Sequence, residues 1–356
     1  MQKKIKVLII DDSALIRQLL KEIFSREPSI EVVGTAADPL IAREKIKQLS
    51  PDVLTLDIEM PKMDGITFLK NLMRLRPMPV VMISTLTEAG ADVTLEALEV
   101  GAVDFIPKPK IDVVDKIQDY ADDIINKVKI ASVARVRPYS DRIIPDVSAK
   151  LSADAILAKG TKKFLQTTEK IIAIGSSTGG TEAIKDILVK MPAHAPAIVI
   201  SQHIPAAFSR PFAKRMDSCC AMTVYEAKNG QQILPGHVYI APGSHHLLVE
   251  RSGARYVCRL NDGPPVNRHK PSVDVMFRSV CQNVGPNAVG VILTGMGDDG
   301  ARGMNEMHDI GSATIAQDEK SSIVWGMPGM AVKQGGVDHI LPLDRIAQKL
   351  LDLCQD

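Results

Sequence analysis

Short, almost wholly apolar runs recur at a regular spacing in the first third of the chain, and this spacing constrains the fold strongly. The runs begin at residues 6, 30, 53, 79 and 103, and helical patterns separate them. A spacing of about two dozen residues is the length of one strand plus one crossover helix in a parallel sheet. Runs without alternation are typical of strands buried on both faces. We therefore expect a doubly wound α/β domain that ends near Val128. The predicted strands are Lys6–Ile10, Ile30–Ala36, Val53–Asp57, Pro79–Ile83 and Val103–Ile106, and the first predicted helix is Ser13–Phe24, with Leu15, Leu19, Leu20 and Ile23 on one face.

A second α/β pattern begins at Ile171, after a stretch whose composition differs from that of the first domain. Residues 129–168 show scattered Pro, Ser, Lys and Arg and no strand pattern, so we expect a linker, with a short helix around residues 153–159. Over residues 169–356 we expect a second doubly wound domain, with a Rossmann-like parallel sheet and a β-hairpin. Its predicted strands include Ile171–Gly175, Ala197–Ser201 and Val289–Thr294, and the predicted hairpin joins His237–Ala241 to His245–Arg251.

The composition narrows the class of protein. Lys and Arg number 43 and Asp and Glu 42, so the net charge is only +1. A nucleic-acid binder whose affinity comes from neutralising phosphates is therefore not expected. The five cysteines include no CxxC pair, which fits a reducing compartment better than a disulfide framework. No apolar run approaches the roughly 18 residues of a membrane-spanning helix, so we expect a cytoplasmic protein without membrane insertion. We also expect a monomer.

Polar residues follow four of the predicted strand ends of the first domain. Asp11 and Asp12 follow the first strand, Asp57 ends the third, Ser84 follows the fourth, and Lys108 lies just beyond the fifth. Because the carboxyl ends of parallel strands meet at one edge of a sheet, these groups should converge. Carboxylates in close proximity repel one another unless a hard cation such as Mg²⁺ binds them. The set predicts an aspartate that accepts a phosphoryl group, whose charge the metal and the lysine neutralise.

A simpler interpretation exists for part of this set, since an Asp pair after a strand is often a helix N-cap. The conjunction of all these residues favours the site. The pattern resembles the receiver domain of two-component response regulators, which is flavodoxin-like, over about residues 4–125. The resemblance implies Asp57 as the phosphorylated residue, Asp11, Asp12 and Asp57 as Mg²⁺ ligands, and Ser84, Phe105 and Lys108, with Pro109 after it, as residues that respond to the phosphoryl group.

A second polar set follows the strand ends of the second domain. Residues 175–179 have the form G-x-S-x-G between a strand and a helix, a turn that exposes the hydroxyl of Ser177. The helix N-terminus behind this turn favours an oxyanion. His203 follows the next strand, and Asp298 and Asp299 lie in the Gly-rich turn after a third strand. An imidazole that a carboxylate orients can remove the proton of a serine, so the set predicts an acyl-transfer hydrolase.

Other interpretations remain open for these segments. The serine turn could bind a phosphate, although it lacks the G-x-G-x-x-G spacing and the P-loop lysine. A histidine at a strand end can be structural, and aspartates beside glycines often form turns. His245 and His246 could be a metal pair, but no third ligand stands near them. The basic loop Asn267–Lys270 could meet an acidic substrate surface or could simply be solvated.

The chain as a whole resembles the CheB family of chemotaxis response regulators, which are protein-glutamate methylesterases. The segments IGSSTGGTEAI, SQHIP, APGSHHLLV, NRHKPSVDVMF and LTGMGDDGA carry the resemblance. It implies Ser177 as the nucleophile, in preference to Ser176, with His203 as general base and acid. It also implies Asp299, in preference to Asp298, as the orienting carboxylate. The implied oxyanion donors are the backbone N–H groups of Thr178 and Met296.

The resemblance also implies a substrate and a regulator. The substrate would be γ-glutamyl methyl esters of methyl-accepting chemotaxis receptors, and hydrolysis, which needs no cofactor, would release methanol. Deamidation of particular receptor glutamines is expected at the same site. A chemotaxis histidine kinase would phosphorylate Asp57 and so release a receiver that covers the esterase site. Two other classes stay open: a response regulator whose output binds a partner or a nucleotide, and a DNA-binding regulator, although no helix-turn-helix pattern is evident.

Overall fold

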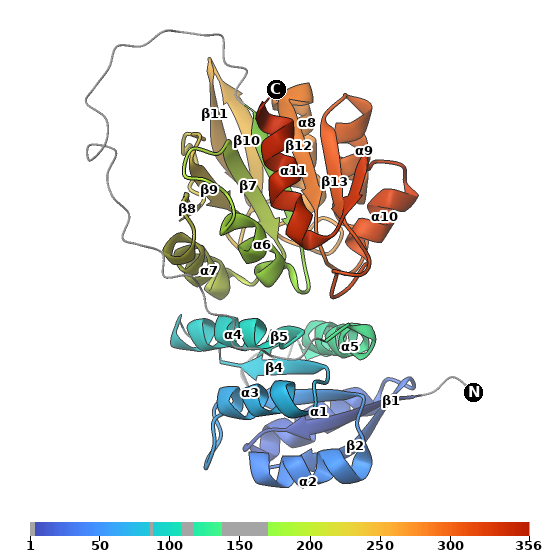
Figure 1. The fold of residues 1–356 in the computed structure, drawn as a ribbon. Coiled ribbons are helices and arrows are strands. Elements are labelled where there is room, and N and C mark those ends of the chain that lie inside the picture. Colours follow the sequence, from blue (N-terminus) through green and yellow to red (C-terminus); the bar gives the residue numbers. More distant parts are fainter. Residues whose placement is uncertain (1–3, 86–87, 109–116, 137–169, 356) are drawn as a thin grey trace. The chain divides into compact units, whose positions relative to one another are not determined.

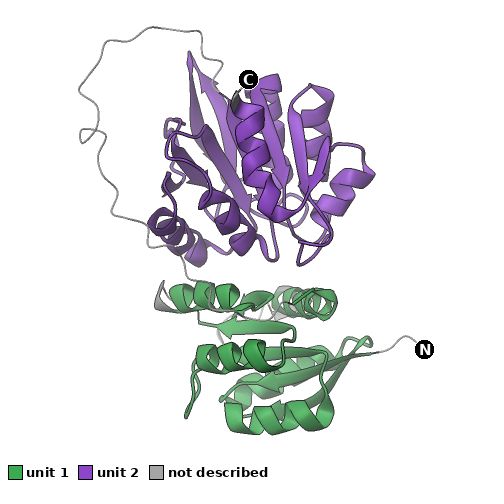
Figure 2. Cartoon of the chain, viewed as in Figure 1, with its two compact units in different colours: residues 1–141 green, residues 142–356 purple. Residues whose placement is uncertain are grey.

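The computed structural model describes residues 4–85, 88–108, 117–136 and 170–355. The chain forms two compact units, unit 1 (residues 1–141) and unit 2 (residues 142–356), as Figure 2 shows. Most of the predicted linker, the short helix predicted around residues 153–159, and Pro109 lie outside the described residues. Whether residues 129–168 act as a linker therefore stays a prediction.

Unit 1 is a five-stranded parallel sheet of order β2-β1-β3-β4-β5 with helices packed against it (Figure 1). All five predicted strands are present, each within one residue of its predicted bounds. The predicted end of the domain at Val128 falls inside the last helix, which continues to Val133. The elements are β1 (Ile5–Ile10), α1 (Ala14–Ser25), β2 (Ile30–Ala36), α2 (Pro39–Leu49), β3 (Val53–Asp57), α3 (Gly65–Leu75), β4 (Val80–Ser84), α4 (Glu88–Val100), β5 (Asp104–Pro107) and α5 (Ile117–Val133).

Helix α1 begins one residue later than predicted, because Ser13 is its N-cap. The Ser13 hydroxyl accepts a hydrogen bond from the backbone N–H of Ile16 at 3.4 Å, which satisfies one of the free donors of the first turn. Ile16, Leu20 and Ile23 are buried against the sheet, whereas Leu15 is 59% exposed. The predicted apolar face was therefore wrong at its N-terminal end.

Unit 2 is built on a seven-stranded parallel sheet of order β14-β13-β12-β6-β7-β9-β8. The chain enters at β6 in the middle, fills one side of the sheet, and then returns to fill the other side. The strand order therefore reverses between β6 and β12, where ligands bind in sheets of this kind. The elements are β6 (Ile171–Ser176), α6 (Gly180–Leu188), β7 (Ala197–Gln202), α7 (Ala206–Cys219), β8 (Thr223–Glu226), β9 (His237–Ile240), β10 (His246–Ser252), β11 (Arg255–Asn261), α8 (Val273–Asn283), η3 (Gly285–Asn287), β12 (Ala288–Ile292), α9 (Ala301–Asp309), β13 (Ala313–Gln317), α10 (Met327–Lys333), β14 (His339–Leu341) and α11 (Leu343–Gln355).

The predicted fold class, two doubly wound α/β domains, is confirmed, but one predicted pairing was wrong. Strand β9 pairs in parallel with β7 and β8, and not with the strand that follows it. The antiparallel hairpin consists of β10 and β11, and Gly253 at φ 63° lies in its turn. Val238, Tyr239 and Ile240 are all buried, which a strand inside a parallel sheet requires. The chain therefore changes direction at the Pro-Gly turn after β9, but the strand that follows the turn does not pair with β9.

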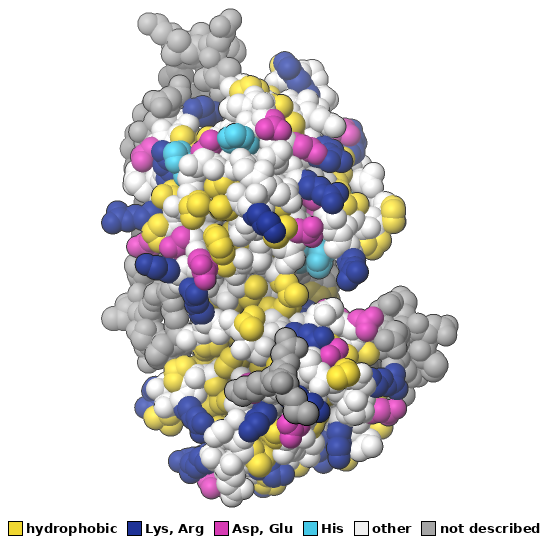
Figure 3. Space-filling view, turned by 90° about the vertical axis from the view of Figure 1, so that its right-hand side faces the viewer, with side chains coloured by type: hydrophobic (Ala, Val, Ile, Leu, Met, Phe, Trp, Pro, Cys, Tyr) yellow, Lys and Arg dark blue, Asp and Glu magenta, His cyan; other side chains and the backbone are white. Residues whose placement is uncertain are grey.

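The distribution of surface charge and the character of the helices concern the predictions about nucleic acid and membranes. On the face shown in Figure 3, basic and acidic side chains are interspersed, in keeping with the net charge of +1. Among the parts of the chain that the structure describes, no helix combines the length and the apolar character needed to cross a membrane.

Candidate functional site

The strand ends of β6, β7 and β12 bring the predicted residues of unit 2 together. Ser176 and Gln202 form the last register pair of β6 and β7, so Ser177 and His203 are the next residues at neighbouring strand ends. The His203 N–H donates to the Ser176 carbonyl at 3.1 Å, and the Ser177 N–H donates to the Thr294 carbonyl at 3.0 Å. Because Thr294 lies just beyond β12, these bonds tie the three loops to one another.

The two serines of the turn have different surroundings. Ser176 is fully buried, and its hydroxyl donates to Oε1 of Gln202 at 2.6 Å. Nε2 of Gln202 donates in turn to the carbonyl oxygens of Ser177 and His203, at 2.9 and 3.0 Å. Ser177 is partly exposed. Ser176 therefore braces the loops through Gln202, and Ser177 carries the hydroxyl that a substrate can reach.

Two glycines allow the loops to approach this closely. A Cβ on Gly180 would lie 2.1 Å from Oε1 of Gln202, and a Cβ on Gly295 would lie 2.7 Å from Cβ of Ser177. The backbone after β12 can therefore pack directly against the serine turn. The two residues predicted to bind an oxyanion follow these contacts in sequence: Thr178 comes after Ser177, and Met296 comes after Gly295.

The imidazole of His203 contacts the carboxylate through its Nε2 atom. Nε2 lies 2.8 Å from Oδ2 of Asp299, while Asp298 is exposed. Nδ1 of His203 is buried and has no hydrogen-bond partner among the described residues. A proton on Nε2 that points at the carboxylate leaves a lone pair on Nδ1. The imidazole therefore offers Nδ1 as its basic nitrogen.

The side chain of Asp299 lies at the N-terminal end of α8, where its surroundings keep the carboxylate ionised. Its side chain is buried, and Oδ2 also accepts a hydrogen bond from the Val273 N–H at 2.7 Å. Oδ1 accepts a hydrogen bond from the Ser272 hydroxyl at 2.8 Å. Burial alone would raise the pKa of Asp299, but the contact with His203 and the donor from Val273 outweigh it and hold the pKa well below its usual range. A carboxylate that stays ionised can orient an imidazole and stabilise its protonated form.

Several residues of this site were not predicted in any role at it, among them Gln202, Asn267 and His269. Nδ2 of Asn267 donates to Oδ1 of Asp299 at 2.8 Å. The ring of His269 stacks on that of His203, with centroids 3.7 Å apart and planes 13° apart. The basic loop that was expected to face substrate or solvent thus contacts both the imidazole and the carboxylate. An Asn in a tight turn was a local signal, because Asn tolerates left-handed backbone, but nothing in the sequence links it to Asp299.

The adjacent histidines after β9 do not form a metal pair. His246 is buried, its Nδ1 accepts a hydrogen bond from the Ser272 N–H at 3.1 Å, and its Nε2 lies 3.0 Å from the Pro264 carbonyl. His245 instead contacts the Ser244 hydroxyl at 2.8 Å. His246 therefore supports the segment that leads into α8.

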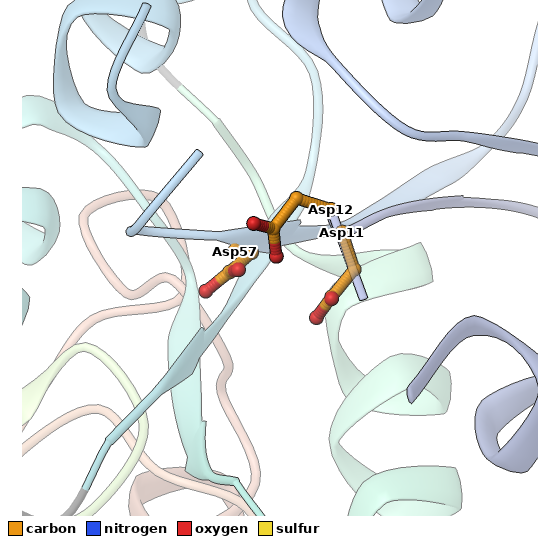
Figure 4. Close-up of side chains that lie close together, drawn as sticks. All are labelled: Asp11, Asp12 and Asp57. Atoms are coloured by element: carbon orange, nitrogen blue, oxygen red, sulfur yellow. The ribbon is translucent and has the colours of Figure 1, made fainter. Parts of the chain in front are cut away.

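In unit 1, the predicted carboxylates converge at the sheet edge (Figure 4). Oxygen atoms of Asp11, Asp12 and Asp57 lie within 4.8 Å of one another. Asp11 and Asp57 are buried, and Asp12 is exposed. Nζ of Lys108 lies 2.8 Å from Oδ2 of Asp57 and 4.0 Å from Oδ2 of Asp11. One ammonium group thus faces two buried carboxylates.

The surroundings of Asp11 fit a divalent cation. Burial, and then the nearby Asp57 carboxylate, raise the pKa of Asp11 to about 6. Oδ2 of Asp11 is buried and has no hydrogen-bond partner in the described parts of the chain. A cation would relieve both the repulsion and the unsatisfied oxygen, and carboxylate oxygens are ligands that Mg²⁺ prefers. The residues present therefore fit the predicted Mg²⁺ ion.

The other predicted residues of unit 1 are divided between two places. Ser84 and Asp57 line one cavity of about 130 Å³. The Ser84 hydroxyl is buried and accepts a hydrogen bond from Oγ1 of Thr94 at 2.7 Å. Phe105 does not line this cavity, and Nζ of Lys127 lies 5.2 Å from its ring centroid. The structure thus brings Ser84 to the acidic site and places Phe105 under a lysine of α5.

Comparisons with known proteins match a family in each unit of the chain. Residues 172–350 match the family described as CheB methylesterase, and residues 7–118 match the response regulator receiver domain. The chain belongs to the CheB methylesterase family. The expected resemblance is thereby confirmed, and the chain is an enzyme of this family with a receiver domain.

Similar proteins cover almost the whole of this CheB-family chain. A protein-glutamate methylesterase/protein-glutamine glutaminase of Hydrogenovibrio crunogenus is 59% identical over 98% of this chain and 99% of its own. One from Xanthomonas campestris pv. campestris is 58% identical over 99% of this chain and 98% of its own. The crystal structure of the Thermotoga maritima CheB methylesterase catalytic domain is 37% identical, covers 52% of this chain and 98% of that chain, and superimposes with a TM-score of 0.51.

Proposed function

We propose that this protein hydrolyses γ-glutamyl methyl esters of methyl-accepting chemotaxis receptors and deamidates particular receptor glutamines at the same site. Two relatives that match nearly the whole chain are named for both activities. The observation that carries the proposal is the 2.8 Å contact between Nε2 of His203 and Oδ2 of Asp299, which leaves Nδ1 basic and without a partner among the described residues. Such a nitrogen at the strand end next to Ser177 suits the activation of its hydroxyl.

Acylation follows from these positions. Oγ of Ser177 attacks the ester carbonyl carbon while Nδ1 of His203 takes its proton. The carbonyl oxygen becomes an oxyanion, which the backbone N–H groups of Thr178 and Met296 bind. The bond to the methoxy group then breaks, and methanol leaves with the proton that His203 returns. Asp299 stabilises the imidazolium while it exists, and the product is an ester between the receptor glutamate and Ser177.

Deacylation repeats the same transfers with water. His203 takes a proton from a water molecule that attacks the acyl carbon, and it returns the proton to Oγ of Ser177 as the glutamate is released. With a glutamine substrate, the imidazolium protonates the leaving nitrogen, and ammonia takes the place of methanol. Each step uses groups of this chain and water, so in this proposal hydrolysis needs no cofactor.

The receiver supplies the regulation in this proposal. Asp57 accepts a phosphoryl group from a chemotaxis histidine kinase, and the ammonium of Lys108 offsets part of its charge. In this proposal the hydroxyl of Ser84, which lines the same cavity as Asp57, binds a phosphoryl oxygen. A Mg²⁺ ion held by Asp11, Asp12 and Asp57 would supply further positive charge at the phosphoryl oxygens. Phosphorylation then releases the esterase from inhibition by the receiver, and this adapts the receptors to a lasting stimulus.

The remaining assignments follow from the same proposal. Phe105 joins Ser84 and Lys108 as a residue that responds to phosphorylation. Residues 1–128 form the receiver, residues 129–168 the linker, and residues 169–356 the catalytic domain. Receptor glutamates and the histidine kinase face the cytoplasm, so the protein acts there, as a monomer.

The test compares two neighbouring serines in the full-length protein. Membranes that carry radiolabelled methylated receptors are incubated with the protein, with and without a small phosphodonor and Mg²⁺. Ser177→Ala should reduce methanol release to background, whereas Ser176→Ala should retain activity, since its hydroxyl is buried against Gln202. Unchanged release by Ser177→Ala would reject the hydrolase. No release by the wild type, together with phosphorylation-dependent capture of another protein, would favour a binding output.

A further inference from the structure

Residues 266–269 form a tight turn next to the imidazole of His203. The Val266 N–H donates to the His269 carbonyl at 3.0 Å, and the His269 N–H donates to the Val266 carbonyl at 2.9 Å. Between them, Asn267 and Arg268 have φ angles of 52° and 68°. Two successive left-handed residues define a type I′ turn, in which Arg is an unfavourable choice. Contacts around the turn must therefore hold it in this form.

Asn267 connects the turn to two buried carboxylates. Its Nδ2 atom donates to Oδ1 of Asp299 at 2.8 Å and to Oδ2 of Asp274 at 2.7 Å. Burial, and to a smaller extent the nearby Asp299, raise the pKa of Asp274. The two N–H groups of the amide thus lie between carboxylates that would otherwise repel each other. The amide thus binds Oδ1 of Asp299, whereas His203 contacts Oδ2 of the same carboxylate.

His269 connects the turn to the imidazole itself. Its ring is nearly parallel to that of His203, at a centroid distance of 3.7 Å. A flat ring at van der Waals distance blocks one face of the imidazole and restricts its rotation. This restriction matters because Nδ1 of His203 is buried and has no partner in the described residues. A ring free to rotate would turn that nitrogen toward water and lose the contact with Asp299.

We propose that Asn267 and His269 are positioning residues for the hydrolysis: Asn267 fixes the carboxylate of Asp299, and His269 fixes the ring plane of His203. The inference rests on the proposed function, because that function assigns His203 as the base. Neither side chain needs to touch the substrate. Both side chains act by orienting Asp299 and His203, and a displacement of about 1 Å can reduce a rate roughly 100-fold.

The experiment uses four variants of the full-length protein, with phosphodonor and Mg²⁺ present. His269→Ala removes the stacked ring, His269→Phe keeps a flat ring, and Asn267→Ala removes the amide. His194→Ala is the matched control, because His194 is exposed in the loop before β7, at the opposite edge of the sheet from the site. The measurements are kcat and apparent KM for methanol release, with thermal unfolding followed by circular dichroism.

His269→Ala should lower kcat roughly 10- to 100-fold and leave KM within about twofold of wild type. Asn267→Ala should lower kcat roughly tenfold. His269→Phe should keep kcat within about threefold of wild type, because a flat ring still covers the imidazole. A purely structural role for the turn would lower the unfolding temperature of the variants without this separation of kcat from KM and without rescue by Phe.

A second measurement does not depend on the receptor. In protein with ¹⁵N-labelled histidine, the proton on Nε2 of His203 should exchange slowly with water in wild type, His269→Phe and His194→Ala. It should exchange rapidly in His269→Ala and Asn267→Ala. This readout separates the two proposals, since a wild type that releases no methanol would reject the hydrolase, and the exchange rates would still test the positioning.

Two results would overturn the inference. One is a folded His269→Ala protein with wild-type kcat and slow exchange. The other is a folded His269→Phe protein as impaired as His269→Ala, because a stacked ring would then not be what matters. If His269→Ala does not fold, the His269→Phe and Asn267→Ala proteins decide the question by the same measurements.

Discussion

His203 contacts Asp299 through Nε2, at 2.8 Å, and leaves Nδ1 without a partner among the described residues. In chymotrypsin-like proteases the two ring nitrogens have the opposite roles, with Nδ1 on the carboxylate and Nε2 on the serine. Either nitrogen of a neutral imidazole can carry the proton, so both arrangements support the same chemistry. The carboxylate determines which nitrogen is basic, and this makes Asp299 the first residue to test.

Asp299→Asn should reduce kcat for methanol release by roughly 10³- to 10⁴-fold, because an amide can favour the wrong tautomer of the imidazole. Asp298→Asn is the matched control: Asp298 is the adjacent carboxylate but is exposed, so its activity should stay close to wild type. Both variants are assayed on methylated receptor membranes with phosphodonor. Equal losses in the two proteins would count against Asp299 as the orienting group.

Asp11 should make the stability of unit 1 depend on pH in the absence of Mg²⁺. Its pKa is about 6 in the folded protein, against an ordinary value of 3.8. Between these values the folded state holds a proton that the unfolded chain has lost, so the free energy of unfolding decreases as the pH rises from about 4 to about 6. Asp11→Asn removes this penalty and should stabilise unit 1 at pH 7 by about 3 kcal/mol in Mg²⁺-free buffer.

Mg²⁺ should stabilise the wild type more than Asp11→Asn and so reduce the stability advantage of the variant. Differential scanning calorimetry is expected to show a transition that Mg²⁺ raises in the wild type, and that it raises much less in Asp11→Asn. Asp92→Asn, which changes an exposed carboxylate of α4, should respond to Mg²⁺ like the wild type. Equal Mg²⁺ shifts in Asp11→Asn and the wild type would remove Asp11 from the ligand set.

Asp57→Asn should abolish the activation of methanol release by a small phosphodonor while basal hydrolysis continues. The amide cannot form the acyl phosphate, and the esterase residues lie in unit 2. Intact-mass measurement checks the modification directly, since the wild type should gain one phosphoryl group and the variant none. A donor response that survives in Asp57→Asn would show that the switch residue lies elsewhere.

Gly295→Ala should separate the loop after β12 from the serine turn. The new Cβ would lie 2.4 Å from Sδ of Met327 and 2.7 Å from Cβ of Ser177, so the loop must move. We expect methanol release to fall roughly 100-fold, with a loss of about 1 to 3 kcal/mol in stability.

Gly311→Ala is the comparison for this change. Gly311 has φ 86° and no atom near its Cβ position, so alanine strains the backbone by about 1 to 2 kcal/mol without crowding the serine turn. Its activity should remain near wild type under conditions where it is folded. If both variants lost activity equally, the close approach of Gly295 to Ser177 would not be needed for hydrolysis.

The sheets and the positions of the predicted polar residues could be predicted because both depend on local patterns. Continuous apolar runs indicate buried parallel strands, and the ends of such strands lie at one edge of the sheet. Ser177, His203 and the pair Asp298 and Asp299 were predicted in this way, since each follows a strand, and the family resemblance then favoured Asp299. The pairing partner of β9 could not be predicted from local patterns, because a Pro-Gly turn has the same sequence whether the next strand pairs with β9 or leaves the sheet.

The sequence by itself thus determined two α/β domains and the residues at their strand ends, because hydrophobic periodicity is a property of neighbouring residues. Only the tertiary structure decided that Nε2 of His203 meets Asp299, and that Asn267 and His269 hold the two in place. The choice of a ring nitrogen and the stacking of two rings depend on how segments far apart in the chain pack. That packing is settled by the summed volumes and hydrogen bonds of the whole domain, which no local pattern contains.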